Sequence, residues 1–378
     1  MIKIVADDKV PFLKGVLEPY ADVRYLPGGS IRNGDVRDAD ALIVRTRTRC
    51  NASLLDQSAV KFIATATIGF DHIDAGYCSS HGIEWTSAPG CNASSVQQYV
   101  ASALMRISGE SGFSLKGKTL GVIGVGNAGT RVAAIAGALG MNVLLNDPPR
   151  QRREGTEIFT DLMELLAVSD IITLHVPLNH KGDDRTFHLF DKQMFKAVRK
   201  GAWLINASRG EVVDTEALKD AIYMERLTGV VLDVWENEPE IDRHLLEMAF
   251  LATPHIAGYS TDGKVNGTAM SVRALSRFFG LPLNDWYPSV IPEPAEPVIS
   301  VSTKGKSDEE IIRRAIFHTY YIVEDDVRLR FNPSSFEKLR GDYPVRREFP
   351  AFTVSLNGGH PELAGLLSKL GFGLVASV

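Results

Sequence analysis

TLGVIGVGNAG, residues 119–129, is an apolar run that ends in three glycines spaced G-x-G-x-x-G, at Gly124, Gly126 and Gly129. Residues 131–139 continue with a helical pattern. In a strand–turn–helix unit of this kind, the glycines allow a tight turn and the close approach of a pyrophosphate, which the amides and dipole of the helix N-terminus attract. Because a glycine-rich turn can also be purely structural, the motif needs further support.

A carboxylate farther along the chain supplies that support. Asp147 lies 18 residues after Gly129, at the end of the strand-like run NVLLND. A carboxylate there accepts hydrogen bonds from the ribose hydroxyls of NAD and repels the 2′-phosphate of NADP. Pro148 and Pro149 offer no cation in its place, although Arg150 leaves NADP open. The predicted cofactor is therefore NAD.

The glycine motif belongs to a series of six strand-like runs that end in polar or glycine-containing turns. These runs cover residues 119–126, 142–147, 170–178, 202–210, 229–235 and 250–258. Six strands suit a doubly wound parallel sheet. We therefore predict an α/β fold with a Rossmann NAD-binding domain over residues 96–258.

The first 90 residues have the same rhythm of short apolar runs and amphipathic segments. The runs lie at residues 2–6, 41–46 and 61–67. This pattern is typical of strands buried in a parallel sheet. One helical pattern leaves this region over 92–107 and another returns to it after Gly258. We predict a second doubly wound lobe, a flavodoxin-like substrate domain of residues 1–95 with 259–285, and a ligand cleft between the lobes.

The remaining residues, 286–378, are predicted to form a small α+β C-terminal domain. Prolines disfavour a helix over 281–301, and Ser307 with Glu310 resembles a capping box at the start of a helix. The run FTVSL looks like a strand, and apolar residues follow at Leu363, Leu366, Leu367 and Leu370. Because a domain of this size has a limited interior, we expect it to pack against a second copy in a homodimer.

Composition excludes several classes of protein. Of 378 residues, 44% are apolar and 23% are charged, and the net charge is −5. These values indicate a globular protein without a general footprint for nucleic acid or anionic membranes. No apolar run reaches the roughly 18 residues of a membrane helix. Cys50, Cys78 and Cys91 lack CxxC spacing, so we expect neither a disulfide framework nor a metal site. Asp7 and Asp8 interrupt any export signal, which favours the cytoplasm.

Three strand ends carry polar residues that together suit the oxidation of a 2-hydroxy acid. Arg209 lies in INASRG, Glu238 in DVWENEP and His255 in TPHIAG. Arginine pairs with a carboxylate through two hydrogen bonds, and histidine titrates near neutral pH and can take the hydroxyl proton. A glutamate can fix the histidine tautomer and favour its protonated form.

Each of these residues also has a structural interpretation when it is taken alone. Arg209 could form a surface ion pair, Glu238 could be a loop carboxylate, and His255 could simply end a strand. Their joint order favours the catalytic interpretation. His175, in LHVPL, is interpreted as structural or as a residue that supports the site without contacting the substrate.

The ordered set GVIGVGNAG, Asp147, INASRG, DVWENEP and TPHIAG resembles the D-isomer-specific 2-hydroxyacid dehydrogenases, over roughly residues 1–280. The resemblance implies that Arg209, Glu238 and His255 are catalytic. It also implies substrate contacts from Thr46, Thr67 and Tyr259. Contacts to NAD are implied for Gly124, Gly126, Asn127, Ala128, Gly129, Asp147, Val176, Ala207, Ser208, Arg209, Asp233 and Gly258.

Further segments resemble a branch of this family with a small phosphorylated 2-hydroxy acid as substrate and a C-terminal dimerisation domain. They read ATATIGFDHID, SAPGCNA, NDPPR, PHIAGY and YPVRREF. Phe70 stands where many relatives have a small residue, so the local pocket shape is expected to differ. Arg45, Arg47 and Arg49 alternate, and in an extended strand they would project to one side and bind the phosphate. A solvated basic strand end is the alternative for these arginines, and Arg346 with Arg347 is a weaker candidate site.

Two other functions remain open at this point. A phosphoglycerate dehydrogenase would share the cofactor and the catalytic residues. An NAD-sensing corepressor, like the C-terminal-binding proteins, would share the fold and a similar catalytic trio. A compact C-terminal domain without an obvious recruitment tail favours the enzyme.

Overall fold

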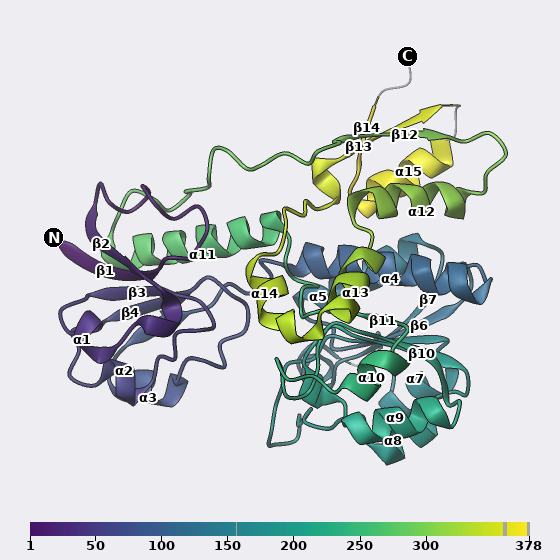
Figure 1. The fold of residues 1–378 in the computed structure, drawn as a ribbon, viewed down its shortest axis with the longest axis horizontal. Helices are drawn as coiled ribbons and strands as arrows, with labels where there is room; N and C mark the ends of the chain where they lie inside the picture. The colour runs from purple at the N-terminus through teal and green to yellow at the C-terminus, as the bar shows by residue number, and fades with distance from the viewer. Residues whose placement is uncertain (156, 358–360, 376–378) are drawn as a thin grey trace. The chain divides into compact units, whose positions relative to one another are not determined.

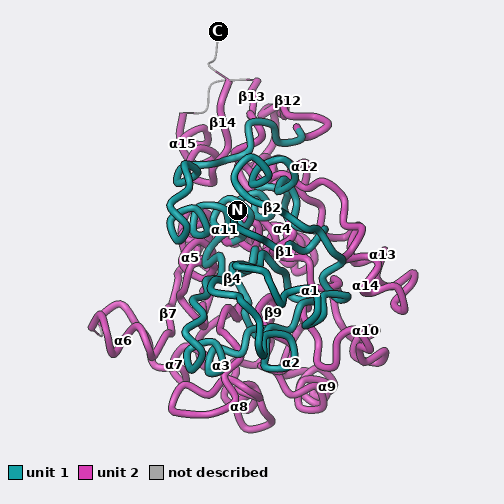
Figure 2. Tube along the Cα trace, turned by 90° about the vertical axis from the view of Figure 1, so that its left-hand side faces the viewer, with its two compact units in different colours: residues 1–92, 260–292 teal, residues 93–259, 293–378 magenta. Residues whose placement is uncertain are grey.

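A computed structural model of the chain describes residues 1–155, 157–357 and 361–375 and forms two compact units (Figure 2). Unit 1 comprises residues 1–92 and 260–292, and unit 2 comprises residues 93–259 and 293–378. The predicted segmentation into three domains, with its boundaries at 95, 258 and 285, stays a prediction.

Unit 1 is built on a five-stranded parallel sheet with the order β2-β1-β3-β4-β5. Its strands are β1 (Ile2–Asp7), β2 (Ala21–Leu26), β3 (Ala41–Val44), β4 (Phe62–Thr65) and β5 (Glu84–Thr86). Its helical segments are η1 (Gly28–Ser30), α1 (Asn33–Val36), α2 (Ala52–Leu55), α3 (Ala75–Ser80) and α11 (Thr261–Phe279). This strand order is the flavodoxin-like order, as predicted.

Helix α11 lies along the sheet of unit 1 (Figure 1). Ser260 caps its first turn by accepting a 2.8 Å hydrogen bond from the Gly263 amide. Val272 and Leu275 of α11 are fully buried with Ile4 and Ile43 of the sheet. The apolar face predicted for a helix after Gly258 thus covers one face of the sheet.

Unit 2 contains a six-stranded parallel sheet with the order β11-β10-β9-β8-β6-β7. Its strands are β6 (Thr119–Ile123), β7 (Asn142–Asn146), β8 (Ile171–Leu174), β9 (Ala202–Asn206), β10 (Leu227–Leu232) and β11 (Leu251–Ala252). The chain reverses its direction across the sheet between β6 and β8. Such a switch point is where doubly wound sheets bind their ligands.

Helices cover both faces of this sheet. The helical segments up to residue 259 are α4 (Ala93–Ser111), α5 (Asn127–Ala138), α6 (Pro148–Glu154), α7 (Leu162–Val168), α8 (Lys192–Ala197), η2 (Gly210–Val212), α9 (Thr215–Tyr223) and α10 (Arg243–Met248). Side chains of β9 alternate between the faces, as a period of two requires. Trp203 and Ile205 join the core formed with α4 and α5, whereas Ala202 and Leu204 join the core formed with α7 and α9.

The C-terminal part of unit 2, which begins at residue 293, adds a small three-stranded sheet. Its order is β12-β13-β14, and both strand pairs are parallel. Its strands are β12 (Val298–Ser302), β13 (Thr353–Asn357) and β14 (Gly373–Leu374). The accompanying helical segments are α12 (Asp308–Thr319), α13 (Val323–Phe331), η3 (Pro333–Ser335), α14 (Phe336–Gly341), η4 (Phe349–Ala351) and α15 (Pro361–Leu370). The capping box of Ser307 and Glu310 is confirmed at the start of α12.

The C-terminal part shares its apolar core with the sheet of unit 2. Ile311 and Ile316 of α12 are fully buried together with Leu104 of α4. Leu363, Leu367 and Leu370 of the predicted apolar set are also buried in this core. In the ranges that the structure describes, no helix has both the length and the apolar character to cross a membrane.

Candidate active site

The glycine turn joins β6 to α5 at the switch point of the unit 2 sheet. Gly124 has a φ of +86°, and a Cβ on it would lie 2.7 Å from the backbone of His175. A Cβ on Gly129 would lie 2.0 Å from the Gly124 carbonyl oxygen, whereas one on Gly126 would meet no described atom within 4 Å. Two of the glycines are therefore required by packing, and Gly126 keeps the helix N-terminus open to an approaching group. These features fit a dinucleotide.

Asp147 is fixed beside this turn. One carboxylate oxygen accepts a 2.8 Å hydrogen bond from the Val125 amide, and the other caps α6 through the Arg150 amide at 2.9 Å. The Arg150 guanidinium bonds to Glu154, with its Nη2 2.6 Å from Oε2. Because Glu154 pairs with Arg150, the cation that left NADP open, the charge beside Asp147 favours a ribose without a 2′-phosphate.

Most of the predicted cofactor contacts lie where strands of this sheet end. Asn127 and Ala128 begin α5, Val176 follows β8, Ala207 and Ser208 follow β9, Asp233 follows β10, and Gly258 follows β11. Since parallel strands present their carboxyl ends at one edge, the fold brings these positions to the same edge of the sheet. Their contacts to NAD stay a prediction.

Asp233 organises the turn that carries His255, which we name the histidine loop (residues 253–258). The Asp233 carboxylate is buried and accepts hydrogen bonds from the Thr253 hydroxyl and the Ile256 amide, both at 2.7 Å, and from the Ala257 amide at 2.8 Å. Its backbone carbonyl accepts a 2.7 Å bond from the His255 amide. Burial raises the pKa of Asp233 despite these donors.

Sequence reasoning missed this supporting role of Asp233. The signal was an acidic residue that directly follows the apolar run GVVL. A carboxylate buried there needs several donors, and backbone amides of a nearby turn are the obvious source.

His255 and Glu238 form the hydrogen-bonded pair that the motifs predicted. Nδ1 of His255 lies 2.7 Å from Oε2 of Glu238, and Oε1 of Glu238 accepts a 2.9 Å bond from the Trp235 amide. The geometry assigns the Nδ1 hydrogen to this bond and leaves Nε2 as the proton acceptor. Burial raises the pKa of Glu238, but the charge and hydrogen bond of His255 outweigh it, so the pKa lies below its ordinary value.

Arg209 lies in the turn after β9, half-buried, next to the loop of Glu238. A Cβ on Gly210 would lie 2.0 Å from the Trp235 carbonyl carbon, so the two backbones are in close contact. The Arg209 carbonyl accepts a 3.0 Å bond from the Asn206 amide group, which fixes the turn. Arg209 and Glu238 are therefore carried by adjacent turns of one unit.

The predicted substrate residues of unit 1 occupy two turns of that unit. Strand β3 ends at Val44, and the Thr48 amide bonds to the Arg45 carbonyl at 3.1 Å in a turn. The expectation that Arg45, Arg47 and Arg49 alternate along an extended strand is therefore wrong. Thr46 is exposed on this turn. Thr67 is half-buried after β4, with its hydroxyl 2.7 Å from that of Thr65.

Phe70 also lies in unit 1 and is 48% exposed. Its ring centre is 5.0 Å from that of Trp85. The large side chain at this position is thus accommodated against a second aromatic ring at the surface of the unit.

The weaker phosphate candidate in the C-terminal part, Arg346 with Arg347, is engaged by protein groups, and its role stays a prediction. Arg346 is 5% exposed, and its Nη2 donates to the Ala257 carbonyl at 2.6 Å. Arg347 lies 3.9 Å from Glu293 with a side chain that is 10% exposed. Neither guanidinium is presented to solvent.

His175 is half-buried in unit 2, with its ring nitrogen Nδ1 in the interior. Its structural or supporting role stays a prediction. Its Nε2 lies 2.9 Å from the Thr173 hydroxyl, and its Nδ1 finds no hydrogen-bond partner among the described residues. Burial lowers the pKa of His175 to about 4, so the imidazole is neutral near pH 7.

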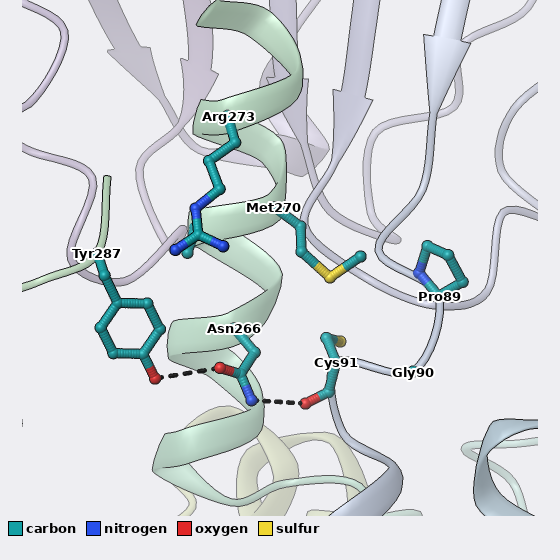
Figure 3. Close-up of a pocket in the computed structure, with 8 residues that line it drawn as sticks. Pro89, Gly90, Cys91, Asn266, Met270, Arg273 and Tyr287 are labelled. Carbon is teal, nitrogen blue, oxygen red and sulfur yellow. Dashed lines mark hydrogen bonds between the residues drawn. The ribbon is translucent and has the colours of Figure 1, made fainter. Parts of the chain in front are cut away.

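A separate pocket of about 230 Å³ lies in unit 1 (Figure 3). Arg273 and Met270 extend from α11 toward it, and Asn266 links the Tyr287 hydroxyl at 3.1 Å to the Cys91 carbonyl at 3.1 Å. It contains none of the predicted site residues.

A glycine turn for a dinucleotide, a histidine–glutamate pair and an arginine lie at the ends of neighbouring strands of one sheet. An imidazole held in one tautomer can exchange a proton, and an arginine can orient a carboxylate beside it. Fold and chemistry together place the chain among the dinucleotide-dependent dehydrogenases.

Comparison with known proteins narrows this class. Residues 92–257 match the family described as "D-isomer specific 2-hydroxyacid dehydrogenase, NAD binding domain", and residues 292–371 match a domain of unknown function, DUF3410. The chain is 48% identical over 354 residues to the erythronate-4-phosphate dehydrogenase of Bacteroides fragilis, covering 93% of this chain and 99% of the relative. It is 43% identical over 372 residues to that of Porphyromonas gingivalis, covering 98% and 100%.

A solved structure agrees with these relatives. The D-lactate dehydrogenase of Aquifex aeolicus, complexed with NAD and lactic acid, is 28% identical and has a TM-score of 0.59, covering 74% of this chain and 95% of that one. The chain therefore belongs to the D-isomer-specific 2-hydroxyacid dehydrogenase family and, within it, groups with the erythronate-4-phosphate dehydrogenases. The predicted family is confirmed.

Proposed function

We propose that this chain oxidises 4-phospho-D-erythronate with NAD to 3-hydroxy-2-oxo-4-phosphooxybutanoate, a step of pyridoxal 5′-phosphate biosynthesis. The observation that carries the proposal is the 2.7 Å bond between His255 and Glu238, in loops at the same edge of the sheet as the NAD-type glycine turn. Full-length relatives of 48% and 43% identity bear the name of this activity.

The roles of the three predicted residues follow from their chemistry. The Arg209 guanidinium pairs with the substrate carboxylate. Nε2 of His255 takes the proton of the 2-hydroxyl group, and Glu238 stabilises the imidazolium that results. NAD, when bound, accepts the hydride from C2, so the alcohol is oxidised to a ketone while the proton goes to the protein.

The cofactor contacts are proposed for the strand ends of unit 2. The amides at the start of α5 would hold the pyrophosphate, and the Asp147 carboxylate would accept the ribose hydroxyls. The backbone approach at Gly126 supports this assignment, since a Cβ there meets no described atom within 4 Å.

Substrate contacts from Thr46, Thr67, Tyr259 and Arg45 are proposed as well. Arg45 is half-buried, and its Nη1 donates to the Lys9 carbonyl at 3.2 Å, which orients the guanidinium. A phosphate contact of this type could contribute roughly 1.5–3 kcal/mol. Arg45→Met should then raise KM for 4-phosphoerythronate far more than KM for D-glycerate, and equal changes for the two acids would argue against the contact.

A homodimer formed through the C-terminal part is proposed too. Val298, Val327 and Phe331 expose 55%, 57% and 90% of their surface, which is apolar area that a second copy could cover. The molar mass of the full-length protein in solution tests this, and a monomer at micromolar concentration would refute it. A cytoplasmic location is proposed because the buried thiols of Cys50 and Cys78 suit a reducing compartment.

The activity is tested by following NADH formation with 4-phosphoerythronate, 3-phosphoglycerate, D-lactate and D-glycerate. The proposal expects the highest kcat/KM with 4-phosphoerythronate. Preferred turnover of 3-phosphoglycerate would support a phosphoglycerate dehydrogenase instead. Tight NAD binding without turnover of any acid would support an NAD-sensing protein.

A further inference from the structure

The histidine loop is held from two sides by buried charged groups. On one side, the Asp233 carboxylate accepts the Ile256 and Ala257 amides. On the other side, the Ala257 carbonyl accepts a 2.6 Å bond from Arg346 Nη2. The same peptide segment, two residues after His255, is thus bonded to an anion and to a cation.

Arg346 comes from the C-terminal part, and its guanidinium is built into a frame of aromatic rings. Its guanidinium carbon lies 4.4 Å from the ring centre of Tyr320 and 5.7 Å from that of Tyr343. Both tyrosine hydroxyls donate to Oδ2 of Asp325, at 3.0 and 2.6 Å. The frame fixes the guanidinium because neither ring can turn without breaking its bond to a buried carboxylate.

Ser95, at the start of α4, completes the contact. Arg346 Nη2 also donates to the Ser95 hydroxyl, which in turn donates to the Ala257 carbonyl at 2.8 Å. The carbonyl therefore receives two donors, and a buried cation accounts for one of them. Leaving these groups without partners in the interior would be costly, so the arrangement is expected to persist.

A second arginine of the C-terminal part acts near the same loop. The Arg340 guanidinium lies 5.7 Å from the ring centre of Tyr259, the residue that follows the histidine loop. Its positive charge also contributes to the lowered pKa of Glu238, behind burial, which opposes the shift, and the larger effect of His255. The C-terminal part therefore contacts Tyr259, next to the histidine loop, and adds positive charge near Glu238, the hydrogen-bond partner of His255.

We propose that Arg346 is a positioning residue for catalysis, which holds the histidine loop in place through the Ala257 carbonyl, so that the C-terminal part completes the active site of its own chain. This inference rests on the proposed function for its kinetic readout. It assigns to residues 336–348 a role in the reaction in addition to any role in assembly.

Arg330 offers a matched control because it makes the same kind of contact elsewhere. Its Nη1 and Nη2 donate to the carbonyls of Leu246 and Ala249 at 2.6 and 2.7 Å, and its Nε pairs with Asp326 at 2.9 Å. Arg330 therefore also joins the C-terminal part to the rest of unit 2, through α10 and its end. Its partner Asp326 accepts a 2.7 Å bond from the Ala252 amide at the end of β11, but among the described residues Arg330 itself makes no hydrogen bond to the histidine loop. A purely structural role would make the two arginines equivalent.

The kinetic test compares Arg346→Met with Arg330→Met in the full-length protein. Because misplacing a catalytic group by about 1 Å can reduce the rate about a hundredfold, Arg346→Met should lower kcat roughly ten- to a hundredfold. KM for NAD should stay within about threefold, since the glycine turn is not contacted. Arg330→Met should keep kcat within about threefold even if it lowers Tm as much. Equal changes of kcat in the two variants would overturn the proposal.

Amide hydrogen exchange gives a readout that needs no substrate. The amides of His255, Ile256 and Ala257 are all bonded to Asp233. Arg346→Met should accelerate exchange in residues 253–258 about tenfold or more, and Arg330→Met should not. Unchanged exchange there in Arg346→Met would refute the positioning role. If the wild type turned over no 2-hydroxy acid, the proposed function would fail while the exchange result still decided about Arg346.

Lysine variants keep the comparison decisive if Arg346→Met does not fold. Arg346→Lys and Arg330→Lys retain the charge and most of the stem but lose the planar fork. A larger loss of kcat and faster exchange in the histidine loop for Arg346→Lys than for Arg330→Lys would support the proposal. Equal effects would overturn it.

Discussion

Replacing Glu238 by glutamine tests the chemistry of the site most directly. The change removes a charge-assisted bond of 2.7 Å to His255 Nδ1. Such a bond contributes roughly 1.5–3 kcal/mol, and with about 1.4 kcal/mol per tenfold change this corresponds to a loss of kcat/KM of about 10- to 150-fold. The glutamine amide can also donate to Nδ1, which would place the imidazole hydrogen on Nε2 and remove the proton acceptor. We therefore expect a loss near the upper value.

The chain contains a matched control for this substitution. Glu236 lies in the same loop, 2.7 Å from Nε2 of His188, and the two glutamate side chains are equally exposed, at 18%. Glu236→Gln should leave kcat/KM within about threefold, because His188 has no proposed role in the reaction. NADH formation with 4-phosphoerythronate provides the assay. Comparable losses of kcat/KM for the two variants would show that the rate depends on the fold of this loop and not specifically on the Glu238 carboxylate.

The pH dependence of the rate provides a second readout of the same variant. Against the opposing effect of burial, the charge and hydrogen bond of His255 lower the pKa of Glu238. Because such an interaction is reciprocal, removal of the carboxylate should move the acidic limb of the pH–rate profile to lower pH. Glu236→Gln should leave the limb in place. An unshifted profile in Glu238→Gln would mean that the carboxylate does not act on the titrating group.

Four further substitutions probe the cofactor site and the fold. Asp147→Asn keeps the shape of the side chain but removes its charge, so the ratio of Kd for NADP to Kd for NAD should fall about tenfold. An unchanged ratio would show that Asp147 does not determine the choice of cofactor. Gly126→Ala should weaken NAD binding with little loss of Tm. Gly129→Ala should lower Tm, because its Cβ would lie 2.0 Å from a carbonyl oxygen. A larger loss of Tm for Gly126→Ala than for Gly129→Ala would contradict the assignment of the turn. The pKa of His175 is lowered to about 4 in the folded state, below about 6.5 in the unfolded state, so stability present above pH 6.5 is lost as pH falls toward 4. Wild type should lose about 2 kcal/mol more than His175→Gln between pH 7 and pH 5 in thermal or denaturant unfolding, and equal losses would show that this imidazole is not the cause.

The parts of the fold that were predictable carry local signals. The glycine turn, the strand before it and helix α5 follow from a motif in which each residue has one steric task. The capping box at Ser307 likewise needs only a spacing of three residues. That Arg209, Glu238 and His255 lie at one edge of the sheet was predictable for a related reason, since parallel strands bring their carboxyl ends to one edge whatever lies between them. Their catalytic roles stay a prediction.

The turn after β3 shows where local pattern is insufficient. Alternating arginines at 45, 47 and 49 suit an extended strand, but the Thr48 hydroxyl donates to the Gly28 carbonyl at 3.0 Å, a bond that spans 20 residues. That buried contact and the bond from the Thr48 amide to the Arg45 carbonyl end the strand at Val44. Strand length there is decided by a neighbouring segment and not by the side chains of the strand itself.

The contacts that support the histidine loop could not be predicted from the sequence for the same physical reason, on a larger scale. Arg346 and Ser95 are separated by 251 residues, and only the folded chain brings both to the Ala257 carbonyl. An arginine in YPVRREF has no local mark that distinguishes it from a phosphate ligand, since the same planar fork binds a phosphate or a backbone carbonyl. Burial favours the second of these roles: the Arg346 guanidinium is 5% exposed and bonded to the histidine loop, so we expect it to stabilise that loop. A phosphate on the proposed substrate would then be held by other cations. A single arginine cannot both hold the histidine loop and bind the phosphate. Because we assign Arg346 to the loop, Arg45 is the arginine to test for the phosphate.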